Sequence, residues 1–127
     1  MAPFRDPMEG EMANWYDEYY EAWSKGDVDT IVKWVTDDVV FEDVTMGHVS
    51  RGRDQYRKFV EICFQRVPDA AYELVEIQTM GDTYWSEWIM QPMGVRGVSV
   101  GKTRDGKIAE NRDYWNGAAF QPAPLPS

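Results

Sequence analysis

Asp43 and Tyr19 are the residues whose types and surroundings could move protons. Val39, Phe41 and Asp43 share one side of a predicted strand, because side chains alternate with a period of two. If Phe41 points into the core, Asp43 does too, and a carboxylate among apolar neighbours is suited to proton transfer. Tyr19 lies in an apolar helix stripe and could donate a hydrogen bond to a developing oxyanion. The alternatives are an exposed turn cap for Asp43 and a plain core aromatic for Tyr19.

Asp113 is a second candidate carboxyl, in the segment Lys107–Trp115. It shares a strand face with Asn111 and Trp115, but parity alone leaves open whether this face is inside or outside. On the outer face it would pair with a basic neighbour. If Asp43 and Asp113 both point inward, one carboxyl of the pair should hold its proton near neutral pH, giving an acid and a base together.

His48 and Cys63 are the single histidine and the single cysteine of the chain. His48 lies in the loop MGHVSRG, where it could serve as an acid or base at a pocket mouth or simply be solvated. Cys63 falls on an apolar helix stripe and is expected to be a core residue. One cysteine allows no internal disulfide and no multi-cysteine zinc site, so we expect no metal. No cofactor is expected either.

Length and charge narrow the possible functions. The chain has 127 residues, which suits one domain, and 13 basic against 22 acidic residues give a net charge of −9. This charge disfavours nucleic acid and anionic membranes as partners. Six Trp and seven Tyr suit a pocket for an apolar molecule, or simply an aromatic-rich core. No leader and no apolar run of about 18 residues is seen, so a cytoplasmic location is expected.

Three helices are predicted to precede most of the strands. The first spans about Met8 to Lys25 and ends at Gly26. Asp27 can cap the second, whose apolar face is expected to reach Val35. The third lies between Gly52 and Pro68. Its apolar stripe consists of Tyr56, Phe59, Val60, Cys63 and Val67.

The remaining segments read as strands joined by short turns. Gly81-Asp82 and Asp105-Gly106 are hairpin signals, which indicates an antiparallel meander at the end of the chain. We therefore expect an α+β fold in which one curved sheet wraps around the helices. The domain should cover residues 8–117, with tails at 1–7 and 118–127. The predicted strands are Val39–Asp43, Ala71–Met80, Thr83–Gln91, Val95–Thr103 and Lys107–Trp115.

The run YEAWSKGDVDTIVKWVTDDVVFED, with a later RG, a helix and DGKIAENRDYWN, resembles the SnoaL-like and ketosteroid-isomerase-like superfamily, also called the nuclear transport factor two-like fold. The resemblance implies a cone-shaped barrel and a homodimer through the exposed side of the sheet. Ketosteroid isomerases use a helix tyrosine, an aspartate base ending the first strand, and a protonated aspartate on a later strand. Tyr19 and Asp43 match the first two, whereas GVRGVSVGKT places Val98 or Ser99 at the third.

The segment NRDYWN also resembles the last strand of limonene-epoxide hydrolases, where an essential aspartate corresponds to Asp113. Those enzymes pair it with an Arg and an Asp on the strand that here reads TYWSEWIMQ. That strand contains no Arg, and Glu87 is its only acid. Trp85 and Trp88 of the same strand have opposite parity, so one faces the cavity or core and the other faces out.

These observations predict a cofactor-independent enzyme that isomerises, cyclises, dehydrates or opens an epoxide on a small hydrophobic molecule such as a polyketide, terpenoid or steroid. Asp43 would be the base, Tyr19 the hydrogen-bond donor and Asp113 the second carboxyl. A non-catalytic binding protein with the same cavity is the alternative, and an accessory domain whose sheet binds a protein is a third possibility. The candidate substrate-binding residues are Trp23, Phe59, Trp88, Ser99, Asn111 and His48.

Overall fold

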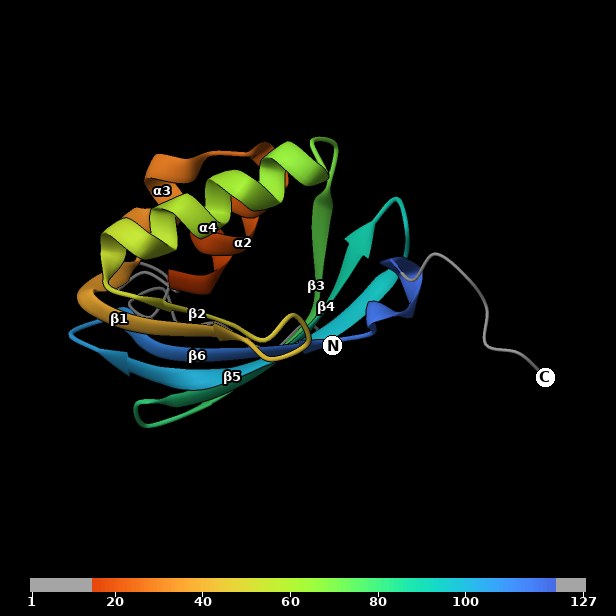
Figure 1. Cartoon of the computed structure of the whole chain (residues 1–127). Helices are drawn as coiled ribbons and strands as arrows, with labels where there is room; N and C mark the ends of the chain where they lie inside the picture. The colour runs from red at the N-terminus through yellow and green to blue at the C-terminus, as the bar shows by residue number, and fades with distance from the viewer. Residues whose placement is uncertain (1–14, 121–127) are drawn as a thin grey trace.

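The computed structural model describes residues 15–120 of the chain, shown as a ribbon in Figure 1. The predicted start of the first helix at Met8 and most of both predicted tails lie outside these residues. None of the helices within the described range is long and apolar enough to cross a membrane. The elements are α2 (Trp15–Lys25), α3 (Val28–Lys33), β1 (Val35–Asp43), β2 (His48–Arg51), α4 (Arg53–Arg66), β3 (Ala71–Met80), β4 (Thr83–Gln91), β5 (Val95–Arg104), β6 (Lys107–Trp115) and the 3-10 helix η1 (Gly117–Phe120).

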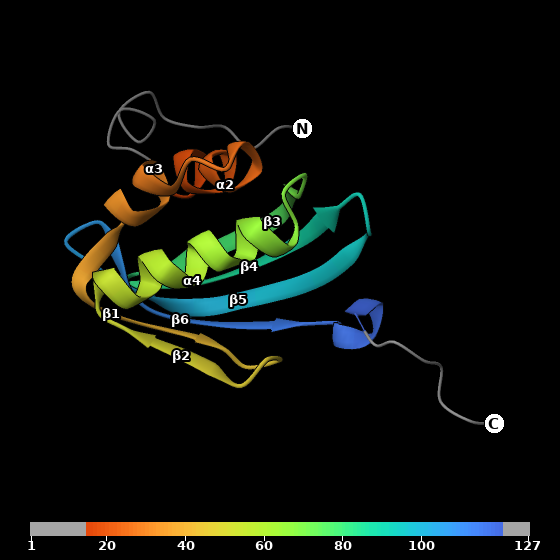
Figure 2. The same cartoon turned by 45° about the horizontal axis from the view of Figure 1, so that its top comes forward.

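One curved six-stranded sheet forms the frame of the molecule. Its strand order is β2-β1-β6-β5-β4-β3. β1 and β6 run parallel, while the other neighbouring strands are antiparallel. Within the described residues, the α-helices α2, α3 and α4 lie on the concave side of the sheet, as Figures 1 and 2 show. The predicted α+β architecture, a curved sheet around helices, is confirmed.

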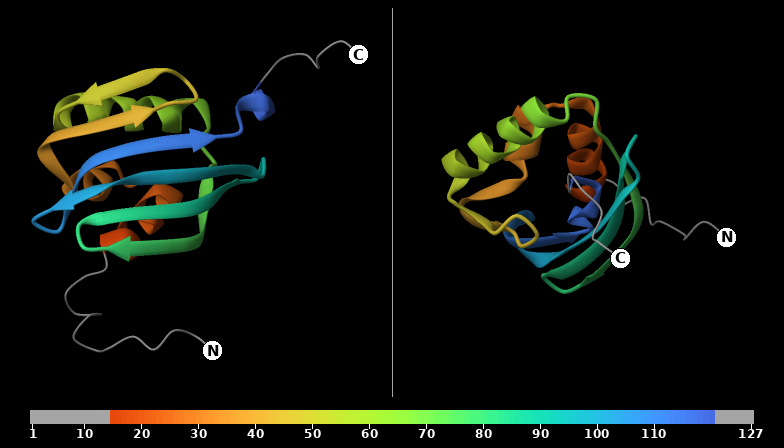
Figure 3. Two further views of the ribbon diagram at one scale, coloured as in Figure 1. Left: turned by 90° about the horizontal axis from the view of Figure 1, so that it is seen from below. Right: turned by 45° about the vertical axis from the view of Figure 1, so that its right-hand side comes forward.

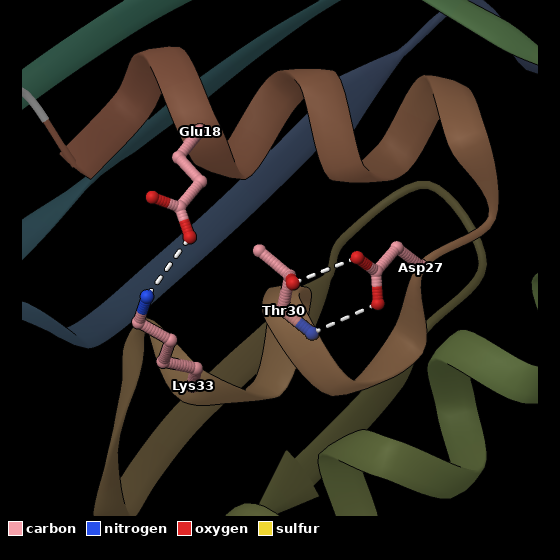
Figure 4. Close-up of polar contacts among 4 residues, drawn as sticks. All are labelled: Glu18, Asp27, Thr30 and Lys33. Carbon is pink, nitrogen blue, oxygen red and sulfur yellow. Dashed lines mark hydrogen bonds and ion pairs between the residues drawn. The ribbon is translucent and has the colours of Figure 1, made fainter.

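The corner between α2 and α3 is fixed by local polar contacts, drawn in Figure 4. Asp27 caps α3 as predicted, because its carboxylate accepts from the Thr30 amide at 3.2 Å and from the Thr30 hydroxyl at 2.7 Å. Lys33 reaches back to Glu18 of α2 at 2.9 Å. These contacts hold the short helix beside α2, which carries the aromatic face that roofs the cavity.

Two element boundaries predicted from the sequence are wrong. The second helix ends at Lys33, and Val35 already belongs to β1, where it pairs with Ile108 of β6. An apolar residue at this position suits a buried strand as well as the apolar face of a helix, and Val35 is fully buried in β1. The loop containing His48 is in part a strand, β2, which pairs antiparallel with β1 and covers an edge that would otherwise be open.

A bulge in β6 explains why parity left the direction of Asp113 open. The register between β5 and β6 shifts by one residue at Ala109. Ile108 and Asn111 have opposite parity along the strand, yet both are buried. Beyond the bulge, Asn111, Asp113 and Trp115 face the concave side of the sheet, where they line a cavity.

Candidate active site

A cavity of about 280 Å³ lies between α2, α4 and the concave face of the sheet. Its wall is mainly aromatic, and four tryptophans contribute to it: Trp15, Trp23, Trp88 and Trp115. The charged residues that line it within residues 15–120 are Asp43, Asp113 and Arg66. An apolar chamber with two carboxyls is suited to bind a small hydrophobic molecule and to exchange protons with it.

Asp43 lies at the end of β1 with its side chain turned inward. Val39, Phe41 and Asp43 are 0%, 3% and 5% exposed, which matches the predicted common face of the strand. The Trp115 indole N–H donates to both carboxyl oxygens of Asp43, at 3.0 and 3.1 Å, and the Met46 amide donates to Oδ1 at 3.0 Å. These donors fix the carboxylate at the cavity wall.

Asp113 is the register partner of Asp43 on the neighbouring parallel strand. Adjacent strands lie about 4.8 Å apart, so the two carboxyls are neighbours in one cavity. The Ser99 hydroxyl donates to Oδ1 of Asp113 at 2.6 Å, and the Asn111 amide donates to the same oxygen at 2.7 Å. No hydrogen bond from the described residues reaches Oδ2. The free oxygen is therefore the one available to a ligand.

Burial, together with a smaller contribution from the charge of Asp43, raises the pKa of Asp113 to about 7 against the hydrogen bonds from Ser99 and Asn111, which lower it. Near neutral pH the group is thus present both as an acid and as a carboxylate. Because Oδ1 already accepts two hydrogen bonds, the proton belongs on Oδ2.

Each donor to Asp113 is oriented by an aromatic residue of β4. The Trp88 indole donates to the Ser99 oxygen at 2.9 Å, and the Tyr84 hydroxyl donates to Oδ1 of Asn111 at 2.5 Å. With their oxygens accepting from these rings, Ser99 directs its hydroxyl proton and Asn111 one of its two amide N–H groups at Asp113. Tyr84 was not among the predicted site residues.

Two glycines of β5 make room for these aromatic rings. A Cβ at Gly97 would stand 2.4 Å from the Trp88 ring. A Cβ at Gly101 would stand 2.1 Å from the Glu110 carbonyl oxygen of β6 and 2.7 Å from the Tyr84 hydroxyl, so a side chain there would displace the β6 backbone as well as the aromatic donor. Glycine inside a strand is a known sign of close approach by another group, so the two glycines in GVRGVSVGKT are the sequence signal for this packing.

Tyr19 lines the cavity from α2 and is buried. Its hydroxyl forms a short hydrogen bond with the hydroxyl of Tyr56 on α4. Burial raises the pKa of both phenols well above the ordinary value, so both remain protonated donors. When Tyr56 donates to Tyr19, the Tyr19 proton is free to point at a ligand.

The remaining predicted residues divide into two groups. Trp23, Phe59 and Trp88 line the cavity together with Ser99 and Asn111, whereas His48 is not part of the lining. His48 is exposed, stacks on Phe59 with ring centroids 5.2 Å apart, and contacts the Ser50 hydroxyl at 3.2 Å. Trp88 faces inward and Trp85, 40% exposed, faces outward, in agreement with their opposite parity.

The Cys63 thiol lines the cavity but is protonated, and no metal ligand cluster accompanies it among the described residues. Burial raises the pKa of the Cys63 thiol to about 12, so it stays protonated and is no nucleophile near neutral pH. Within residues 15–120, no cluster of three or more His, Cys, Asp or Glu side chains could hold a metal ion.

Replacing Ser99 with alanine should raise the midpoint of the Asp113 titration. The Ser99 hydroxyl donates to the carboxylate, and a hydrogen bond to a charged group is worth about 1.5 kcal/mol, or roughly one pKa unit. The midpoint can be followed by carboxyl carbon NMR. Ser86→Ala is the matched control, since Ser86 is equally buried but bonds to Tyr20. A downward shift in Ser99→Ala would contradict the assignment.

Comparison with known proteins places the chain in a family. The SnoaL-like domain model matches residues 16–111. A putative polyketide cyclase from Sinorhizobium meliloti is similar in structure, with a TM-score of 0.72 and 18% identity over 83% of this chain and 97% of that one. A protein with a ketosteroid isomerase-like fold from Catenulispora acidiphila DSM 44928, in complex with trimethylamine, has a TM-score of 0.74 and 16% identity over 80% and 84%.

A third similar structure is an NTF-2 like protein from Burkholderia xenovorans LB400, with a TM-score of 0.71 and 21% identity over 93% of this chain and 89% of that one. A comparison with curated proteins found no match. At these identities the structural likeness concerns the fold alone. The family model, however, covers most of the 127 residues, and the chain belongs to the SnoaL-like domain family.

Proposed function

We propose that the protein is a cofactor-independent enzyme that removes a proton next to a carbonyl group of a small hydrophobic molecule and so isomerises it or closes a ring. One observation carries the proposal. Two carboxyls from neighbouring strands face the same apolar cavity, and one of them is shaped to keep its proton near neutral pH. Such a pair supplies a base and an acid at once.

Asp43 would act as the base. Its carboxylate is held by the Trp115 indole and the Met46 amide, and it borders the chamber in which the substrate would lie. The C–H bond breaks, the proton passes to Asp43, and the electron pair moves onto the carbonyl oxygen. No electron leaves the substrate, so this step needs no redox cofactor.

Asp113 and Tyr19 would stabilise the oxygen on which negative charge develops. The proton on Oδ2 of Asp113 and the phenol of Tyr19 are two hydrogen-bond donors on the cavity wall. In an apolar site such preorganised donors stabilise an enolate more strongly than water does. The enol then regains a proton at another carbon, which is isomerisation, or attacks a second carbonyl, which closes a ring.

Epoxide opening fits the cavity less well. Glu87, the acid on the strand that supplies the hydrolase partners, pairs with Arg96 at 2.8 Å, an arginine whose side chain is 66% exposed. Neither residue lines the cavity. The enolisation proposal also agrees with the description of the Sinorhizobium meliloti relative as a putative polyketide cyclase.

Proton exchange with an enolisable ketone tests the proposal without knowledge of the natural substrate. We expect the protein to catalyse deuterium uptake by 2-tetralone in D₂O, followed by proton NMR, at a rate above that of buffer. Denatured protein is the control for adventitious catalysis. Binding of the ketone without exchange would contradict an enzyme and favour a non-catalytic binding protein.

We also propose a homodimer through the outer face of the sheet. Figure 3 shows this face uncovered by the described helices. Trp85, Val98 and Tyr114 on β4, β5 and β6 are 40%, 37% and 44% exposed, and Val98 pairs with Tyr114 in register. Neighbouring apolar side chains of this kind are suited to self-association.

Replacing Trp85 with lysine is expected to convert this dimer to a monomer, because a charge would be buried in the apolar contact. Light scattering coupled to size exclusion should give twice 14.7 kDa for the parent chain and 14.7 kDa for Trp85→Lys. Met80→Lys is the control, since Met80 is 81% exposed at the end of β3. A monomeric parent chain would contradict the proposal.

A further inference from the structure

Arg66 is a cation at the cavity that no acidic side chain of the described residues neutralises. It lies in the last turn of α4 and lines the cavity, where the other charged residues of the described lining are Asp43 and Asp113. Arg53 and Arg57 of the same helix pair with Asp37 and Asp29. Arg66 forms no ion pair within residues 15–120, so its guanidinium donors are available to a ligand.

The position of Arg66 marks the mouth of the cavity. Among the lining residues Arg66 and Met46 are exposed, whereas Trp15, Tyr19 and Tyr84 are buried at the inner end. Figure 1 shows the end of α4, the turn between β1 and β2 and the end of β6 at the same end of the cone. A ligand in the cavity would therefore have one end beside Arg66.

Cys63 connects Arg66 to the carboxyl pair. It precedes Arg66 by three residues, which places both side chains on one face of α4. Cys63 and both carboxyls line the same cavity of about 280 Å³ as Arg66, so one small molecule can contact the guanidinium and the carboxyl pair together.

The charge pattern of the cavity selects the orientation of a ligand. Deep in the cavity an anionic group would lose its hydration among apolar side chains, and beside the carboxyl pair it would be repelled by Asp43. At the mouth, by contrast, the planar fork of a guanidinium matches a carboxylate with two parallel hydrogen bonds. In a protein with a net charge of −9, an unneutralised cation is also needed to attract an anion to this opening.

We infer that the cavity takes an apolar carboxylic acid, which enters with its hydrocarbon body first and leaves its carboxylate on Arg66 at the mouth. This inference shares with the proposed function only the cavity. If the ligand is also the substrate, its reacting carbonyl lies at Asp43 and Asp113, and its carboxylate on Arg66 serves for recognition and takes no part in the chemistry.

Calorimetric titration with 2-naphthoate and its neutral counterpart 2-naphthamide tests this inference at pH 8. We expect the parent protein to bind the acid about 3- to 10-fold more tightly than the amide, because Arg66 is exposed and its ion pair is screened. Arg66→Gln should weaken naphthoate binding to the level of naphthamide and leave naphthamide binding unchanged. Arg57→Gln, which removes a cation from the same helix outside the cavity lining, should keep the preference.

Equal affinity of the parent protein for the two compounds would overturn the inference, as would a preference that survives in Arg66→Gln or the failure of both to bind. The calorimetric titration measures binding and does not depend on turnover. A protein that prefers naphthoate through Arg66 but does not exchange protons with 2-tetralone would support this inference while contradicting the proposed enzyme.

Discussion

Asp43→Asn is expected to lower the rate of proton exchange by about 10²–10⁴-fold, the range that a positioned general base contributes. The amide keeps the shape of the carboxyl and an oxygen that can accept from Trp115 and Met46, but it cannot take up the substrate proton. The free energy of unfolding should therefore change by no more than about 1 kcal/mol. Deuterium uptake by 2-tetralone and urea unfolding measure the two quantities.

Glu42→Gln is the matched control for this variant. Glu42 precedes Asp43 on β1 but has opposite parity and does not line the cavity. Glu42→Gln removes one negative charge, as Asp43→Asn does, but at the neighbouring residue, and it should leave the rate of proton exchange unaltered. Full exchange activity in Asp43→Asn would show that the base is another group.

Asp113→Asn should remove a pH dependence of stability that the parent protein shows between pH 5 and pH 8. The ordinary pKa of an aspartate carboxyl is 3.8, whereas that of Asp113 in the fold is about 7, so the folded chain binds the extra proton. Stability from this group is present at low pH and is lost as pH rises to the folded pKa. Between pH 5 and pH 8 the free energy of unfolding should therefore fall by about 2 kcal/mol, a value that allows for the part of the carboxyl that remains accessible to solvent.

Urea unfolding of both proteins at pH 5, 6, 7 and 8 measures the difference. Hydrogen bonds and nearby charges lower the pKa values of Glu18, Asp27 and Asp38, so these groups titrate below the window. Glu110→Gln, on an exposed position of β6, is the control for a change in net charge. If the free energy of unfolding changes with pH in the same way in the parent protein and in Asp113→Asn, the raised pKa of Asp113 is contradicted.

Much of the fold could be predicted because the periods of its elements are regular. The meander was bounded by turn signals, and Asp105 and Gly106 indeed have positive φ angles of 53° and 76°. The inward direction of Asp43 followed from a strict alternation with Phe41. The start of β1 was missed because Val35 fits the apolar face of a helix as well as a buried strand position.

The site was harder to predict because its geometry depends on contacts across the sheet. The direction of Asp113 is set by a bulge at Ala109, and its partners Ser99 and Asn111 become neighbours only through strand pairing. The role of Tyr84 depends on Gly101, which belongs to another strand. Arg66 likewise could not be predicted as a ligand-binding residue, because its place in the cavity lining depends on how α4 packs over the sheet.

Direct titration of Asp113 tests the central claim, that two facing carboxyls share the cavity and one keeps its proton near neutral pH. The carboxyl carbon signal of Asp113, assigned by its loss in Asp113→Asn, can be followed by NMR from pH 3 to pH 9. We predict a midpoint near 7 that moves down in Asp43→Asn, because the charge of Asp43 contributes to the raised pKa. A midpoint near the ordinary aspartate value of 3.8, unchanged in Asp43→Asn, would contradict the account.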